Sequence, residues 1–313
     1  MPIPGTKSEL LFIHAETPMH PGTGSAIGTV DLPVAREKHT SWPLIPASSL
    51  KGVLRDRCHS NSRGTDEFLA VFGPEPGDDN PDRKASEHAS ALSLTDARLL
   101  AFPVRSVKGL FAWVTCPAAL QRLERDARLA GNEDLKAKAQ ACLSTNPQPG
   151  GKTALSASEQ IMLGNNQMVL EEFDYSCQQA ADVRALGESL DALLGTGTRL
   201  STHLAVVSDD FFTHYAKFAT EVMARIGIDY ETKTVRTGAL FYEEFLPAGV
   251  VFYTMAMACK PHAEKSGGLA SGRDVLDYVK KQAGEPAILQ IGADATIGKG
   301  LCTVSFAEGG NGA

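Results

Sequence analysis

Residues His20–Arg57 read HPGTGSAIGTVDLPVAREKHTSWPLIPASSLKGVLRDR, and this stretch organises the rest of the chain. Its glycines permit backbone turns where other residues would clash, and its four prolines remove donors that a strand ladder needs. We therefore expect a long loop from His20 to Pro46 with no regular element. Loops of this length inside compact domains are usually functional or disordered. The apolar residues in this one indicate an anchored, functional loop.

A helix is predicted directly after the loop. Ser48 or Ser49 offers an N-cap, and the apolar residues that follow recur at helical spacing. Lys51 and Arg55 are four residues apart, so they share one face of this helix.

Asp31 stands in the middle of the loop, shortly before Arg36, Lys38 and His39. The sequence thus places a carboxylate near a concentration of positive charge. Two interpretations stay open from the residues alone. Asp31 either pairs with a neighbouring cation as an ordinary loop acid, or it belongs to a site.

The composition is that of a soluble globular protein, with 43% hydrophobic and 21% charged residues among 313. No apolar run has membrane-spanning length and no signal peptide is recognisable, so we expect a cytoplasmic protein without a membrane partner. The six cysteines form no C-x-x-C pair, which argues against a zinc site.

The net charge of the chain is −7, whereas a general nucleic-acid-binding protein usually has a positive net charge. Acids gather between Asp66 and Asp82, however, and Arg36–Arg57 is locally basic, so one face could still hold a phosphate backbone.

Strand-like and helix-like segments interleave along the chain without a phosphate-binding βαβ fingerprint, which predicts an α+β fold. A strand with both faces covered is expected over residues 9–17. A long hairpin is expected at about 222–246, and a glycine-rich turn at 292–300 joins the last two strands.

The glycine-rich turn departs from a P-loop, because its first glycine is one position early and Gly300 replaces the hydroxyl residue. It either lets a phosphodiester backbone approach, with Lys299 to pair it, or is purely structural. The histidines show no metal-binding spacing, and His20 stands out only because it opens the loop. Glu243 and Glu244 are adjacent in a strand and point to opposite faces, so they cannot form one dyad. One could reach a site, and we expect the other to be solvated.

Several segments together carry a family pattern. They are TPMHPGTG from Thr17, GTVDLPVAREKHT from Gly28, PASSLKGVLR from Pro46, TGALFYEEF from Thr237 and LQIGADATIGKG from Leu289. The chain resembles the RAMP superfamily of CRISPR proteins, and more closely the backbone (fourth) subunits of type III-B Cmr effector complexes. The resemblance extends over essentially the whole chain.

This resemblance implies a single RAMP domain over residues 1–313. It would have a modified RRM or ferredoxin-like palm, a β-hairpin thumb at about 222–246 and inserted segments. Such subunits stack head-to-tail along a guide crRNA, together with other Cmr subunits. Each thumb flips a nucleotide out of the guide–target duplex, and a loop aspartate cuts the target RNA beside it. In this chain the matching aspartate is Asp31.

The resemblance thus implies a metal-dependent endoribonuclease with Asp31 as catalytic residue and Mg²⁺ ligand. An aspartate alone is ordinarily a weak base at neutral pH, which favours metal assistance. His20 could act as acid or positioner, and Glu243 could assist. The expected RNA-binding residues are either positively charged or located at the predicted helix N-terminus. They are Arg36, Lys38, Ser49, Lys51, Arg55, Arg57 and Lys299. Two alternatives remain: a non-catalytic guide-RNA scaffold, and a stand-alone nuclease that processes precursor guides.

Overall fold

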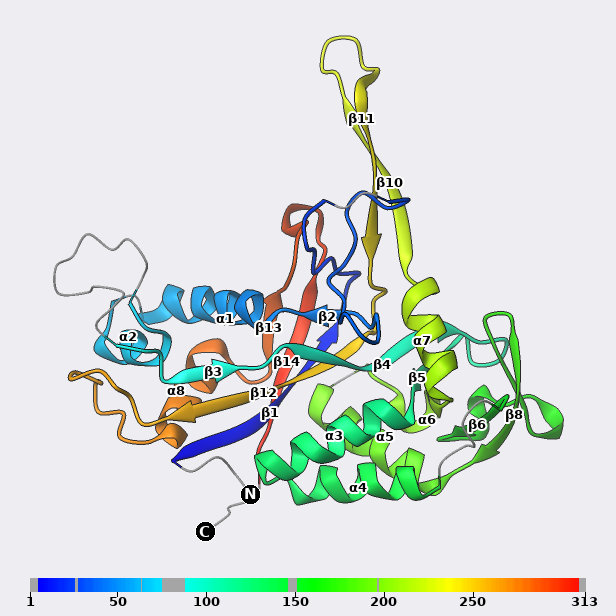
Figure 1. Cartoon of the computed structure of the whole chain (residues 1–313), viewed down its shortest axis with the longest axis horizontal. Coiled ribbons are helices and arrows are strands. Elements are labelled where there is room, and N and C mark those ends of the chain that lie inside the picture. The colour runs from blue at the N-terminus through cyan, green and yellow to red at the C-terminus, as the bar shows by residue number, and fades with distance from the viewer. Residues whose placement is uncertain are drawn as a thin grey trace.

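The computed structural model describes residues 5–25, 28–62, 64–74, 88–145, 151–195 and 197–309 (Figure 1). Most of the acidic stretch expected between Asp66 and Asp82 lies outside these residues.

One large mixed sheet forms the body of the protein. Its strands, in spatial order, are β13 (Ala287–Gln290), β14 (Leu301–Ala307), β1 (Thr6–Ala15), β12 (Val251–Cys259), β4 (Ala97–Arg105), β5 (Phe111–Thr115), β9 (Leu204–Val206), β6 (Thr153–Ser156), β8 (Phe173–Gln179) and β7 (Gln167–Leu170). Two short strands, β2 (Leu44–Ile45) and β3 (Leu92–Leu94), pair with β4 and β12. β1 pairs antiparallel with both β12 and β14, so the first and last parts of the chain meet in the interior of the sheet.

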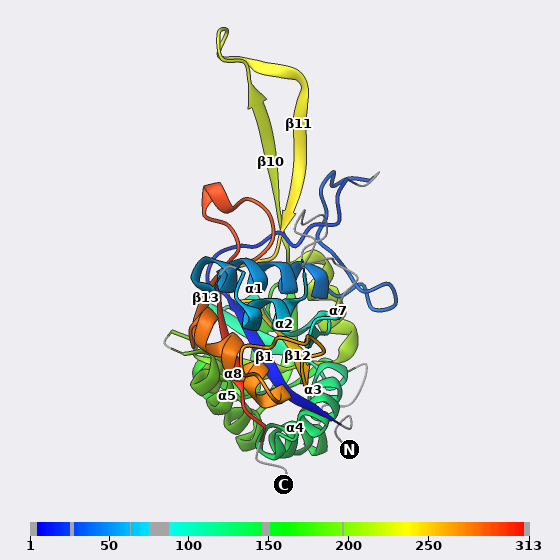
Figure 2. The ribbon, with the colours of Figure 1, turned by 90° about the vertical axis from the view of Figure 1, so that its left-hand side faces the viewer.

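Helices cover both faces of this sheet (Figures 1 and 2). They are α1 (Ala47–Ser62), α2 (Asp66–Phe72), α3 (Pro117–Ala130), α4 (Glu133–Ser144), α5 (Ala181–Leu194), α6 (Leu200–His203), α7 (Asp209–Phe218) and α8 (Gly272–Ala283). Leu11 and Ile13 of β1 enter the core that α1 and α8 share, whereas Leu10 and Phe12 enter the core of α3 and α5. The expected strand with two covered faces is therefore confirmed, because alternate side chains of a strand point to opposite faces.

A second, two-stranded sheet stands away from the body (Figures 1 and 2). It consists of β10 (Glu221–Ile228) and β11 (Val235–Phe245), and we call this hairpin the thumb. Ile226, Tyr230 and Leu240 are among its exposed apolar side chains. Apolar exposure on this scale is typical of a surface that meets a partner.

The described residues of the loop after β1 make isolated bridges, much as its glycines and prolines predict. The expectation of no regular element before Pro46 is wrong at Leu44–Ile45, which form the strand β2 against β4. The expected serine N-cap is wrong. α1 begins at Ala47, whose amide donates to Asp96 Oδ1 at 2.8 Å, while Pro46 O accepts from Leu50 N at 3.1 Å. A carboxylate from the connection between β3 and β4 thus caps the helix, and Ser49 lies inside its first turn.

The fold is α+β with a ferredoxin-like palm, as predicted. In the described part of the chain, no helix is both long enough and apolar enough to cross a membrane.

Two glycines of the glycine-rich turn allow a matched test of whether its close approach to His20 constrains the structure. Gly292 has φ of 94°, and a Cβ there would lie 2.4 Å from His20 O, whereas Gly298 has φ of 74° and open space around it. We expect Gly298→Ala to lower the free energy of unfolding by about 1 kcal/mol through backbone strain alone. Gly292→Ala adds a clash and should cost roughly 1–3 kcal/mol more in urea denaturation. Equal losses would show that the close approach to His20 does not constrain the turn.

Candidate functional site at the base of the thumb

The loop after β1 joins the thumb through main-chain hydrogen bonds. Asp31 N and Leu32 N both lie 3.1 Å from Tyr242 O, and Glu244 N donates to Leu32 O at 3.0 Å. The Asp31 side chain completes the link, because its Oδ2 accepts from Tyr242 N at 2.8 Å. The carboxylate of Asp31 is therefore held at the edge of β11, and the residue remains partly exposed.

Glu243 and Glu244 point to opposite faces of β11, as their adjacency predicts. Glu243 pairs with Arg225 of β10, and Glu244 Oε1 lies 2.5 Å from Arg36 Nη2. Glu244 Oε2 also accepts from Val34 N at 3.0 Å. The expectation that one of the two is solvated is wrong, since both are buried. A buried carboxylate needs partners, and each one has an arginine.

His20, at the start of the loop, is buried on the same side of β11 as Glu243. Its Nδ1 is 2.6 Å from Glu244 O, so Nδ1 carries the proton and donates to this carbonyl. Its Nε2 faces Glu243 Oε1 at 3.8 Å. The ring packs edge-on against Phe245, and Lys299 Nζ lies 4.7 Å from the centre of the same phenyl ring. The structure thus brings His20, Glu243 and Lys299 together.

Sequence reasoning missed two residues of this site. Arg225 Nη1 reaches Asp294 Oδ2 at 2.6 Å as well as Glu243, and so joins both thumb strands to the glycine-rich turn. The hydrogen bond from Arg225 lowers the pKa of Asp294. The only signal in the sequence was the presence of an acid, Asp294, inside the glycine-rich turn. In the structure this residue has a left-handed backbone conformation, with φ of 64°. We call His20, Arg225, Glu243, Asp294 and Lys299 the thumb-base cluster.

The two cations expected on one face of α1 pack against the protein itself. Lys51 Nζ donates to Ser90 Oγ at 2.7 Å and to Leu92 O at 2.9 Å, and burial lowers the pKa of Lys51. Arg55 Nη1 donates to Phe72 O at 3.1 Å. Both side chains do share a face, and that face is turned towards α2 and β3.

The other expected RNA-binding residues are spread over three places. Arg36 donates to Ser41 O, Ala216 O and Glu244, and therefore ties the loop to α7 and the thumb. Lys38 is exposed in the loop. Arg57 is exposed on α1 and reaches Ala283 O at 3.2 Å. The structure does not gather these cations into one patch with Lys299.

The described residues do not form a complete metal site. Among them, no group of three or more histidine, cysteine, aspartate or glutamate side chains could hold an ion. Asp31 Oδ1 has no protein partner in this part of the chain, whereas Oδ2 is occupied by Tyr242 N. The chain could therefore offer a Mg²⁺ ion one carboxylate oxygen, and RNA oxygens and water would have to complete the coordination.

A family model described as the RAMP superfamily matches residues 12–303. The chain belongs to the RAMP superfamily. Among its RAMP relatives, the CRISPR system Cmr endoribonuclease Cmr4 of Pyrococcus furiosus is 35% identical, over 96% of each chain. The CRISPR system CMR subunit Cmr4 of Saccharolobus solfataricus is 26% identical over 93% of each chain.

Solved RAMP structures show the same fold. The crystal structure of oligomeric Cmr4 from Pyrococcus furiosus has a TM-score of 0.70 and 29% identity, and the match covers 96% of this chain and 98% of that one. A chain of the type III-B Cmr-beta complex bound to cognate target RNA has a TM-score of 0.73 at 24% identity, with 96% of each chain covered. The predicted family is confirmed by these matches.

The thumb-base cluster predicts an acid-sensitive contribution to stability. Asp294 has a lowered pKa in the folded chain, so the stabilisation it supplies is present above its usual value of 3.8 and is lost as the pH falls through the folded-state value. Asp294→Asn should lower the free energy of unfolding at neutral pH by about 1.5 kcal/mol, the value of a hydrogen bond to a charged group. It should also flatten the decline of the melting temperature below pH 4. Asp210→Asn, at an exposed acid on α7, is the control. An unaltered acid decline in Asp294→Asn would mean that the ion pair contributes nothing.

Proposed function

We propose that this chain is a target-RNA endoribonuclease and a filament-forming backbone subunit of a type III-B CRISPR effector. The observation that carries the proposal is the carboxylate of Asp31. The loop after β1 places this carboxylate at the base of the apolar thumb, where the backbone amide of Tyr242 fixes it. The Pyrococcus relative with 35% identity is named an endoribonuclease, which supports the same activity here.

Assembly into a filament is supported by the shape of the chain and by a relative. The thumb extends from the body with apolar side chains that no part of the described chain covers, so a second molecule is needed to bury them (Figure 1). The similar Pyrococcus structure is described as oligomeric. A head-to-tail contact between identical copies does not close on itself and produces a filament along the guide crRNA. Other Cmr subunits would bind its ends.

The proposed chemistry starts with distortion of the target RNA. The thumb's exposed Ile226, Leu240 and Tyr242 would wedge into the guide–target duplex. Unstacking one nucleotide costs about a few kcal/mol, which these apolar contacts offset. The flipped nucleotide leaves its 2'-hydroxyl in line with the adjacent phosphate. The 2'-oxygen then attacks phosphorus, its proton leaves towards Asp31, and the bond to the 5'-oxygen breaks. One fragment keeps a 2',3'-cyclic phosphate, and the released 5'-oxygen takes up a proton from water.

His20 and Glu243 act in this proposal from below the reacting groups. Both are buried, and His20 holds the carbonyl of Glu244 beside the strand segment that binds Asp31. We assign them the positioning of Asp31, with His20 as the candidate acid if the loop opens. Lys299, Lys38 and Arg57 are the partly or fully exposed cations proposed to pair with phosphates. Lys51, Arg55, Ser49 and Arg36 would support the RNA path from within the protein.

Mg²⁺ is proposed as the cofactor, held by Asp31 Oδ1 and by oxygens of the RNA. When bound, such an ion lowers the pKa of an attacking hydroxyl and stabilises charge on the phosphate. The residues of this chain fix the Asp31 carboxylate through the amide of Tyr242.

Asp31→Asn tests the assignment of the carboxylate. The amide oxygen can still accept from Tyr242 N, so the loop should keep its place while the charge is lost. We expect target cleavage by the assembled complex to fall by about 100-fold or more, with guide and target binding retained. Cleavage is measured on labelled target RNA and binding by gel shift. Asp277→Asn, an exposed acid on α8, is the control. Full cutting by the complex that carries Asp31→Asn would leave only the scaffold function.

Metal removal tests the proposed cofactor separately. Chelation with EDTA should stop target cleavage, and added Mg²⁺ should restore it, because the proposed ion activates the attacking hydroxyl. RNA binding by the same complex should persist in EDTA, since phosphate contacts come from lysine and arginine. Undiminished cleavage in EDTA would rule out a divalent cofactor while leaving the role of Asp31 open to the substitution experiment.

A further inference from the structure

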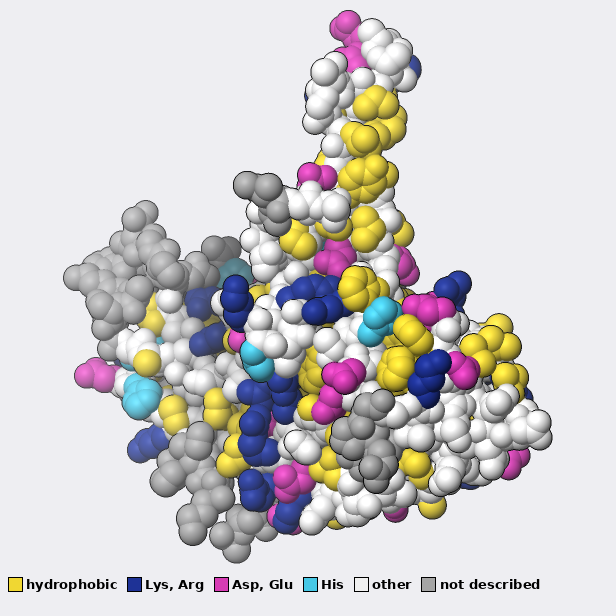
Figure 3. All heavy atoms as spheres, turned by 45° about the vertical axis from the view of Figure 1, so that its right-hand side comes forward, with side chains coloured by type: hydrophobic (Ala, Val, Ile, Leu, Met, Phe, Trp, Pro, Cys, Tyr) yellow, Lys and Arg dark blue, Asp and Glu magenta, His cyan; other side chains and the backbone are white. Residues whose placement is uncertain are grey.

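A polar hollow of about 550 Å³ lies on the body, between the loop after β1, the strand β4 and the helix α3. Its wall includes six lysine, arginine and histidine side chains and two acidic ones. Nothing in the sequence singled out its central residues, which are Arg98, Arg122 and Arg125. In Figure 3, lysine and arginine side chains form a band that descends over the body from below the thumb.

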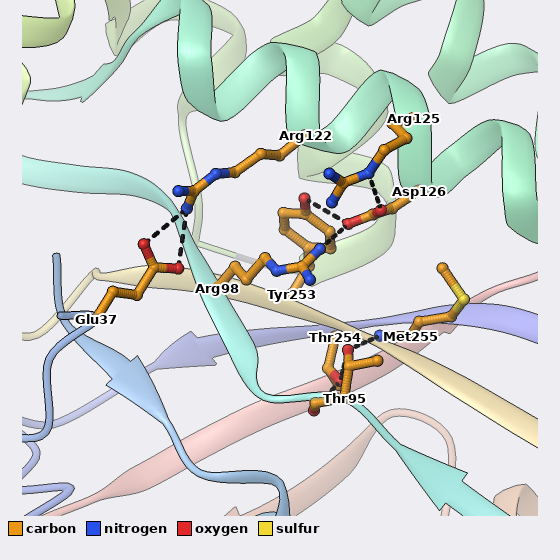
Figure 4. Close-up of polar contacts among 9 residues, drawn as sticks. All are labelled: Glu37, Thr95, Arg98, Arg122, Arg125, Asp126, Tyr253, Thr254 and Met255. Atoms are coloured by element: carbon orange, nitrogen blue, oxygen red, sulfur yellow. Dashed lines mark hydrogen bonds and ion pairs between the residues drawn. The ribbon is translucent and has the colours of Figure 1, made fainter. Parts of the chain in front are cut away.

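Two of these arginines are oriented by one buried carboxylate (Figure 4). Asp126 is 3% exposed, and it accepts from Arg98 Nη1, from Arg125 Nε at 2.9 Å and from Tyr253 Oη at 3.1 Å. Burial and the adjacent Asp126 raise the pKa of Tyr253, so its hydroxyl remains a donor. One negative charge therefore holds two guanidinium groups, and a positive charge is left over.

The third arginine is held from the other side of the hollow. Arg122 Nη1 donates to both oxygens of Glu37, at 2.9 and 3.0 Å, and its guanidinium lies 4.8 Å from the ring of the buried Trp42. Glu37 also accepts from Thr40 Oγ1, so its carboxylate has a second partner. Arg122 is thus stacked and bonded, which fixes its plane.

Several donors of these arginines remain available. Within the described chain, neither terminal nitrogen of Arg125 has a protein acceptor. Arginines held in place by other groups lose little side-chain entropy when they bind an anion, and their paired N–H groups match the oxygens of a phosphate.

The lining favours a nucleic-acid backbone over a protein. Leu44 is the one purely apolar side chain among the described residues that line the hollow, whereas protein interfaces usually have apolar cores. The same described lining holds no phenylalanine, tyrosine or tryptophan, so bases would find no broad stacking platform. Lys38 and His39 extend the wall into the same loop that carries Asp31. An RNA strand at the base of the thumb could therefore continue into the hollow.

We propose that Arg98, Arg122 and Arg125 form a second, sequence-independent docking groove for the ribose-phosphate backbone of single-stranded RNA. The groove rests on the proposed function, since it receives an RNA strand already bound at the thumb base. Either the guide or the target strand could supply this backbone.

The test measures RNA affinity across a salt titration, by fluorescence anisotropy with the full chain and a fluorescent single-stranded RNA. Arg122→Gln with Arg125→Gln removes two phosphate contacts, yet leaves Asp126 with Arg98 and Tyr253, and Glu37 with Thr40. We expect the affinity to fall about tenfold and the slope of log K against log[salt] to decrease by about 1.4, at ~0.7 per contact. The control, Lys152→Gln with Arg184→Gln, makes the same charge change at two side chains that are each 56% exposed. If the double variant does not fold by circular dichroism, Arg125→Gln alone should lower the slope by half as much.

An unchanged affinity and slope would overturn the groove. A change in self-association with an unchanged RNA slope would also overturn it, because the hollow would then bind protein. To separate the two strands, 4-thiouridine is placed in the guide or in the target of the assembled complex, and crosslinks to the α3 peptide are mapped. A crosslink from one strand supports the groove and identifies its source, whereas none from either strand contradicts it.

Failure of the proposed nuclease function would look different. Asp31→Asn should leave the anisotropy slope unaltered, so continued cleavage by that variant would refute the catalytic assignment and not the groove. A parent chain with no affinity for RNA would refute both.

Discussion

The site depends on the backbone N–H and C=O of Tyr242. Its carbonyl accepts from the loop at Asp31 and Leu32, and its amide donates to the Asp31 carboxylate. A loop of this length has many conformations of its own, and ordering each residue costs about 1–2 kcal/mol. The edge of β11 offers the backbone partners that offset this cost. The position of the candidate carboxylate is therefore set by the thumb, 211 residues later in the chain.

The two glutamates that follow Tyr242 give this junction its rigidity. Glu243 faces Arg225 and Glu244 faces Arg36, so the two sides of one strand are each fixed by an ion pair with a different segment. Buried pairs of this kind contribute specificity of arrangement more than net stability. Here the arrangement that they specify is the angle between the loop, the thumb and the palm.

The sequence was most informative where its signals were local. Alternating apolar residues in β1 predicted two covered faces, prolines and glycines predicted the loop, and adjacency predicted that Glu243 and Glu244 diverge. Three contacts could not be predicted from the sequence. They are the Asp96 cap of α1, the Arg225–Asp294 pair and the sharing of Asp126 by Arg98 and Arg125. Their long-range partners are brought together by strand order, at separations of 28 to 69 residues that no periodicity reports. The resemblance to RAMP proteins identified Asp31, whereas the geometry shows what holds it.

The thumb has a mechanical consequence. Among the described residues it is a long two-stranded hairpin anchored at its lower end, where Arg225 bridges to the turn that carries Asp294. A force on the tip, such as contact with a bulky neighbour, produces its greatest torque at this fulcrum. The catalytic candidate hangs from the same hairpin, at Tyr242, one residue before the Glu243 that Arg225 holds. Because the tip and the segment that holds Asp31 belong to the same hairpin, a tilt of the tip is transmitted to the attachment of this carboxylate.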